Sequence, residues 1–152
     1  GVPGIVGVGG YPVNNMISVM DRPEEGFRAL IDSDGWRIGY MRHSPQWTFE
    51  QINEFQRHEE SDEVFVLLQG SCCLLLGDGD AQLGTISAVE MEPLKVYSIR
   101  RGIWHSHLVD EGTDVMVVEN SSVALENSPY ISLTEEQRDC VKQLGRCRMV
   151  KK

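Results

Sequence analysis

The chain has 152 residues, the length of one ordinary domain, and its 41% hydrophobic and 24% charged residues are typical of a globular protein. No apolar run approaches the ~20 residues that a membrane-spanning helix needs. The net charge of −9 disfavours nucleic acid and anionic membrane surfaces as partners, because both attract clustered Lys and Arg. A small molecule or another protein is therefore the expected partner.

Residues 1–30 are predicted to form an N-terminal arm and edge segment. The first dozen residues are rich in Gly, and the weakly patterned stretch from Met16 to Arg28 fits an edge strand or a short helix. The first basic residue is Arg22, so the basic start of a secretory signal is missing. We therefore expect a cytoplasmic location.

The middle of the chain, residues 31–126, alternates between short apolar segments and turn residues. Turn sequences such as GDGD and DEGT separate these segments. The pattern is typical of an all-β sandwich or barrel. Strands are expected at residues 36–41, 64–69, 72–76, 85–91, 95–99, 103–109 and 114–120.

Residues 127–152 are predicted to form a helical tail on the outside of the barrel. Thr134 and Gln137 have the spacing of a capping box, and Leu133, Val141 and Leu144 supply apolar positions. Gly145 is expected to end this helix, since Gly commonly follows the last helical turn.

The four cysteines do not have the spacing of a metal knuckle. Cys72 and Cys73 are adjacent on an expected strand, so their side chains should point to opposite faces. Cys140 and Cys147 lie in the predicted helix. All four are expected to be reduced thiols.

The segment RHEESDEVFVLLQG, residues 57–70, raises the question of function. If Glu63 begins a strand, it shares one face with Phe65 and Leu67, and both faces of that strand are apolar. A carboxylate buried there costs several kcal/mol unless a metal ion or another cation meets it. The alternative is a solvated strand end, in which Glu63 pairs with Arg57 or Arg101.

Gln56 and His58 precede Glu63 in the chain, and His105 and His107 follow it on a later expected strand. Gln56 and His58 are two residues apart, as are His105 and His107, so each pair shares a face of an extended segment. Imidazole and carboxylate ligands suit Fe, Mn, Zn, Ni or Cu, and two His with one carboxylate leave positions open for substrate.

These residues resemble the two motifs of the cupin superfamily. The first motif, Gly-x5-His-x-His-x3-4-Glu-x6-Gly, is matched by His58, four residues, Glu63, six residues and Gly70. The second, Gly-x5-Pro-x-Gly-x2-His-x3-Asn, is matched by Gly102 and His105. The chain departs from the motifs at three places, Gln56, Arg100 and Val109.

The resemblance implies a bacterial-type antiparallel jelly-roll β-barrel with a short C-terminal helix, and a homodimer as its assembly. It also implies one divalent transition metal ion (Fe, Mn, Zn or Ni), with His58, Glu63 and His105 as ligands. Gln56 would be the fourth ligand. His107 would be a pocket residue, and the alternative ligand to Gln56.

Further side chains are candidates for the pocket by chemistry alone. Large aromatic residues are more often core, so each has a structural alternative. Arg100 and Arg101 fit either a fork for a substrate carboxylate or phosphate, or an exposed turn. Candidate pocket residues are Tyr40, Arg42, Trp47, Phe55 and Trp104, and candidate acids or bases are Glu59, Glu60, Tyr40 and His107.

The function expected from these features is that of a metal-dependent enzyme with isomerase, lyase or oxygenase chemistry. Its substrate would be a small polar metabolite such as a sugar or carboxylate, whose oxygen the metal polarises. The alternative is a non-catalytic cupin that binds or senses a small molecule. Tight stoichiometric binding without turnover would favour that alternative.

Overall fold

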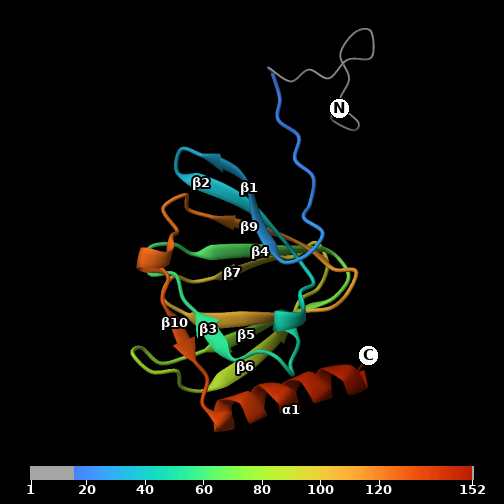
Figure 1. Ribbon diagram of the computed structural model, residues 1–152, viewed down its shortest axis with the longest axis vertical. Coiled ribbons are helices and arrows are strands. Elements are labelled where there is room, and N and C mark those ends of the chain that lie inside the picture. The colour runs from blue at the N-terminus through green and yellow to red at the C-terminus, as the bar shows by residue number, and fades with distance from the viewer. Residues whose placement is uncertain (1–15, 152) are drawn as a thin grey trace.

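The computed structural model describes residues 16–151, in which ten strands form two five-stranded antiparallel sheets that face one another (Figure 1). Sheet A has the order β1 (Phe27–Ser33), β2 (Trp36–Arg42), β9 (Asp114–Glu119), β4 (Glu63–Gln69) and β7 (Val96–Ile99). Sheet B has the order β10 (Tyr130–Ser132), β3 (Glu54–Gln56), β8 (Trp104–Val109), β5 (Cys72–Gly77) and β6 (Ile86–Glu90). The architecture is the expected jelly roll, built as a sandwich of two sheets.

All seven strands predicted from the sequence are present, and β1, β3 and β10 are additional. β1 runs across residues 30 and 31, where the arm was expected to meet the barrel. It begins at the end of the stretch expected to hold an edge strand or a short helix, and it lies at the edge of sheet A, where most of its residues are exposed. β3 and β10 have only three residues each and are defined by pairing with one another. The predicted arm in residues 1–15 lies outside the described residues.

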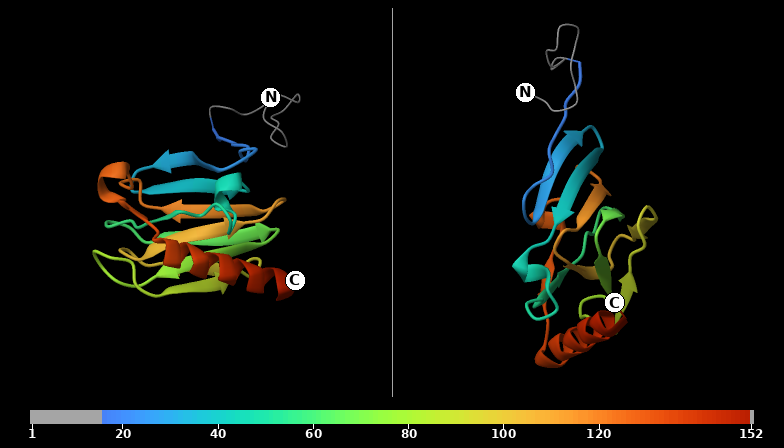
Figure 2. Two further views of the ribbon diagram at one scale, coloured as in Figure 1. Left: turned by 60° about the horizontal axis from the view of Figure 1, so that its bottom comes forward. Right: turned by 90° about the vertical axis from the view of Figure 1, so that its right-hand side faces the viewer.

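Sheet B is covered on both faces at its centre, where β5 and β8 have two buried sides, whereas β6 and β10 are largely exposed. Its inner face packs on sheet A, and its outer face packs on α1 (Glu135–Lys151), which runs across it in Figure 2. The inner core includes Met41, Phe65, Leu67, Leu74, Val109, Val115 and Val117. The outer core includes Phe55, Leu75, Trp104, Leu108 and Val141.

The C-terminal helix begins as the sequence predicts but does not end where Gly145 was expected to stop it. The Gln137 backbone N–H donates to Thr134 Oγ1, and the Thr134 N–H donates to the Gln137 side chain, which completes the capping box. The helix then continues through Gly145 to Lys151. A Cβ on Gly145 would lie 2.4 Å from the Cβ of Phe49, so this Gly permits close packing against the turn that precedes β3 rather than ending the helix. Within the described residues, no helix combines the length and apolar character needed to cross a membrane.

The adjacent cysteines lie on opposite faces of β5, as predicted. Cys72 belongs to the inner core and Cys73 to the outer core. Burial raises the pKa of both thiols, that of Cys73 to about 11, so neither is a thiolate at neutral pH. All four cysteines are free.

Two glycines of the motifs occupy left-handed backbone conformations, and the structure predicts different costs for replacing them. Gly70 has φ +84°, and a Cβ there would lie 2.5 Å from the Cα of Thr113. Gly102 has φ +83° with open space around it. Gly102→Ala is expected to lower the free energy of unfolding by about 1 kcal/mol, from the conformation alone. Gly70→Ala should cost about 3 kcal/mol, because the added clash is with backbone.

Urea denaturation of the two alanine variants measures this difference. Gly102→Ala is the matched control, since it changes the same residue type at nearly the same φ. Equal losses of stability in the two variants would contradict the steric explanation for Gly70.

Candidate metal centre

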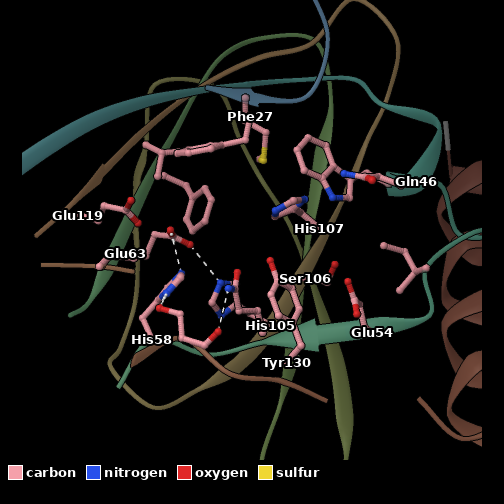
Figure 3. Close-up of a pocket in the computed structure, with 18 of the residues that line it drawn as sticks. Phe27, Gln46, Glu54, His58, Glu63, His105, Ser106, His107, Glu119 and Tyr130 are labelled. Carbon is pink, nitrogen blue, oxygen red and sulfur yellow. Dashed lines mark hydrogen bonds and ion pairs between the residues drawn. The ribbon is translucent and has the colours of Figure 1, made fainter. Parts of the chain in front are cut away.

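A cavity of about 690 Å³ opens between the two sheets, and Glu63, His58 and His105 converge on one another inside it (Figure 3). Glu63 is the first residue of β4 in sheet A, and His105 lies on β8 in the opposite sheet. His58 lies in the loop between β3 and β4, where its carbonyl accepts a hydrogen bond of 2.8 Å from the Gly102 N–H. The two motifs of the sequence therefore meet at one place.

The three side chains are buried and within reach of a single ion. Nε2 of His58 is 3.1 Å from Oε2 of Glu63, and Nε2 of His105 is 3.1 Å from Oε1. One potential ligand atom from each residue can be chosen so that all three lie within 4.8 Å of one another. Ligands at about 2.1 Å from an ion and at right angles to one another are about 3 Å apart. The two nitrogen–oxygen distances of 3.1 Å therefore fit a first-row transition metal.

The outer nitrogens of the two imidazoles are already occupied. His105 Nδ1 donates to the carbonyl of Ile103 at 3.0 Å, and His58 Nδ1 is 2.7 Å from Oγ of Ser128. With its proton on Nδ1, a neutral His105 turns the Nε2 lone pair toward a carboxylate oxygen. That contact is repulsive unless a proton or a metal ion lies between the two atoms. The donor set therefore fits a cation.

Electrostatics around Glu63 favour its charged form. Burial opposes the charge, but hydrogen bonds from His105 and His58 outweigh it and hold the pKa of Glu63 well below its ordinary value. Burial likewise opposes charge on His105, and its hydrogen bond to Glu63 overcomes this and raises its pKa.

Glu119 is a member of the site that sequence reasoning missed. It ends β9, where it is the register partner of Glu63 on β4. Burial, together with the hydrogen bond and charge of Glu63, raises the pKa of Glu119 to about 8. Its Oε1 also accepts from Arg37 Nη1 at 3.2 Å. Both carboxylates stand at one end of an apolar strand, Glu63 at the start of β4 and Glu119 at the end of β9. This shared position is the sequence feature that could have identified Glu119.

Gln56 and His107 also line the cavity. Gln56 is the register partner of His105, and its amide nitrogen donates to the Ser128 carbonyl at 3.1 Å. The His107 ring lies edge-on to Trp47 at 4.5 Å between centroids, away from the three converging side chains. Burial lowers the pKa of His107 to about 4, so the imidazole is neutral.

Eight other residues named from the sequence are not among those lining the cavity: Tyr40, Arg42, Phe55, Glu59, Glu60, Arg100, Arg101 and Trp104. Trp104 faces α1, because it is adjacent to His105 on β8 and so points to the opposite side of the sheet. Arg101 is exposed, and its backbone N–H donates to Asp62. Tyr40 lies near Asp114. Burial and, to a smaller extent, the charge of Asp114 raise the pKa of Tyr40. The fork proposed for a substrate carboxylate therefore lies outside the cavity.

Several lining residues come from segments that the sequence did not connect with the site. Phe27 of β1 reaches the cavity across Gly39, where a Cβ would lie 2.4 Å from the aromatic ring. Ser128 and Tyr130, on either side of Pro129, approach from the segment that was expected to be helical. Their contribution depends on β10 pairing with β3, for which the sequence carries no signal.

Comparison of the sequence with protein-family models and with curated proteins finds no match. Solved structures do match the fold. The Streptomyces nucleoside dehydratase Pac13 has a TM-score of 0.54 at 9% identity, over 77% of this chain and 88% of that one. The polyketide cyclase RemF from Streptomyces resistomycificus has a TM-score of 0.52 at 21% identity, over 82% and 92%. A variant of oxalate decarboxylase from Bacillus subtilis has a TM-score of 0.51 at 16% identity, over 76% and 33%.

These similarities, together with the two facing sheets, show that the chain shares the fold of these solved structures, which is the jelly roll that its resemblance to cupins implied. The expected antiparallel jelly roll of that type is confirmed. At these identities the neighbours inform the fold alone.

Proposed function

We propose that the protein holds one divalent transition metal ion through His58, Glu63 and His105 and is a metal-dependent enzyme acting on a small molecule. The observation that supports this most is the pair of imidazole Nε2 atoms, each 3.1 Å from an oxygen of the same buried carboxylate. Gln56 remains the predicted fourth ligand. Fe, Mn, Zn and Ni are the candidate ions.

The ion would supply Lewis acidity toward a carbonyl or hydroxyl oxygen of the substrate. The chain's own residues would do the remaining work. Ser128 and the Ile103 carbonyl fix the orientation of the two imidazoles, and the inner core behind Phe65 keeps the bottom of the cavity dry. Glu119, beside Glu63, is placed to hold or move a proton near the substrate.

Isomerase, lyase and oxygenase reactions are all compatible with such a site. The fold neighbours include a nucleoside dehydratase, a polyketide cyclase and a decarboxylase, so dehydration and cyclisation are also worth testing. A second candidate is a non-catalytic cupin that binds or senses a small molecule. The replacement of a motif His by Gln56 favours it, because an amide is a weaker ligand than an imidazole.

Chelator-treated protein, reloaded separately with Fe, Mn, Zn or Ni, separates these candidates. We expect one ion per chain by elemental analysis, and turnover of a screened substrate by one loaded form that the chelated form lacks. Stoichiometric ligand binding without turnover in every loaded form would support the sensing protein instead. Failure of all four ions to bind would overturn the proposed metal site.

The homodimer, the bacterial origin and the cytoplasmic location inferred from the sequence remain predictions. Light scattering after size-exclusion chromatography measures the first of them directly. A monomer at micromolar concentration would contradict it.

A further inference from the structure

The cavity extends beyond the three converging side chains into an aromatic end. The rings of Trp47 and His107 meet edge-on at 4.5 Å, and the Phe65 ring is 6.2 Å from His107. Figure 3 shows His107 on the side toward Gln46, with Phe27 above it and His58 on the far side. Because two flat rings and an imidazole border this end, its shape and chemistry suit a planar ring.

His107 has no protein partner for its ring nitrogens within residues 16–151. Its Nδ1 is enclosed and makes no hydrogen bond, and no described residue bonds to Nε2. The other three histidines each place Nδ1 against an oxygen, of Val109, Ser128 or Ile103. A polar ligand group that pairs with a ring nitrogen of His107 would form a hydrogen bond that no described residue supplies, and would so gain affinity. Since Nδ1 is enclosed, Nε2 is the ring nitrogen that remains for such a ligand.

The charges lining the cavity disfavour a negatively charged ligand. Carboxylates of Glu54, Glu63 and Glu119 line it, and Arg37 is the one Lys or Arg among its described lining residues. Arg37 is already engaged: it pairs with Asp32 and Glu119 and donates to the carbonyls of Ser121 and Val123. Glu119, whose pKa is raised to about 8, is largely protonated at neutral pH, so the cavity disfavours an anion chiefly because its described lining offers no free Lys or Arg.

We propose that the cavity selects an uncharged planar ring compound. The ring would lie at the aromatic end against Trp47 and Phe65, with a polar atom on its edge paired with His107. An oxygen substituent would point toward Glu63 and its two imidazoles. The inference rests on the proposed function in one respect, that this oxygen approaches the metal ion. It replaces the sugar or carboxylate expected from the sequence with a neutral ring, and it excludes phosphorylated substrates.

A matched set of probes tests the charge and the ring separately. 4-Hydroxybenzyl alcohol and 4-hydroxybenzoate share a phenol ring and differ in charge, while glucose is neutral without an aromatic ring. Binding is measured by ligand-observed NMR titration on chelated and on zinc-loaded protein. We expect the alcohol to bind at least about 10-fold more tightly than either of the other two.

Variants of His107 test its part. His107→Phe keeps the ring contact with Trp47 but removes both nitrogens, and should weaken binding of the alcohol about 5- to 10-fold. His107→Gln restores a hydrogen-bonding group and should recover part of the loss. Trp47→Leu should weaken binding similarly, whereas Trp36→Leu, at an exposed position outside the cavity, should not.

Equal affinity for the alcohol and the benzoate, unchanged binding by His107→Phe, or no binding by any probe would overturn this inference. The binding measurement on chelated protein does not depend on the metal site. Ring binding that depends on His107 in a protein that takes no metal would leave this inference standing and remove the proposed metal-dependent function. Metal binding without ring binding would do the reverse.

Discussion

Glu63→Gln is expected to lower the affinity for the metal ion at least about 100-fold, because it replaces the charged ligand with a neutral amide of the same shape. Changes in groups that only orient a ligand already cost 10- to 100-fold, and the loss of a ligand should exceed that. Competition with a chromophoric chelator measures the affinity. Glu59→Gln is the matched control, since Glu59 is an exposed carboxylate in the loop that precedes β4.

Thermal stability provides an independent readout of the same change. An ion that binds only the folded chain and is present at 100 times its dissociation constant stabilises the wild type by about 2.7 kcal/mol. At that ion concentration a 100-fold weaker variant gains only about 0.4 kcal/mol. Equal metal-induced shifts of the melting temperature in Glu63→Gln and Glu59→Gln would show that Glu63 is not a ligand.

Asp114→Asn is expected to lower the free energy of unfolding by about 2 kcal/mol. The Asp114 side chain is 2% exposed. It accepts hydrogen bonds from Arg22 Nη1 at 2.7 Å and from the Gln69 amide, and forms an ion pair with Arg42 Nε at 3.2 Å. The substitution leaves Arg22 and Arg42 without their partner, but these side chains are 46% and 20% exposed, so solvent screens part of the loss. Asp32→Asn is the control, because that carboxylate is half-exposed and should cost less than about 0.5 kcal/mol.

The contribution of Asp114 should also depend on pH. Burial opposes its charge, but hydrogen bonds from Gln69 and Arg22 outweigh it and keep the pKa of Asp114 below its ordinary value. A lowered pKa in the folded state means that the stabilisation is complete above the unfolded pKa of about 4 and is lost as the pH falls through the folded pKa. Urea denaturation of wild type and Asp114→Asn should therefore give a difference that is constant from pH 7 to 5 and shrinks below pH 4. A constant difference down to pH 2 would contradict this account.

Much of the candidate site followed from local spacing. The strand that begins at Glu63 and the alternation of His105 and His107 depend only on the two-residue period of extended backbone, which any strand obeys. The capping box of α1 is local in the same way, because Thr134 and Gln137 satisfy each other within one turn. For such features neighbours in sequence are also neighbours in space.

Other features required the pairing of distant segments. Glu119 enters the site only because β9 pairs with β4 in a register that places it beside Glu63. Gly145 is a packing residue only because Phe49 lies against it. Some residue types common in pockets lie outside the cavity here. Examples are Trp104 and Tyr40, which point away from it on their strands, and Arg101, which lies in an exposed turn.

The sequence by itself determined which residues share a face and where a charged side chain enters an apolar strand, since both follow from backbone periodicity. The tertiary structure decided which faces meet, because strand order and register depend on contacts between residues far apart in the chain. The aromatic end of the cavity, bordered by Trp47, Phe65 and His107, belongs to the second kind.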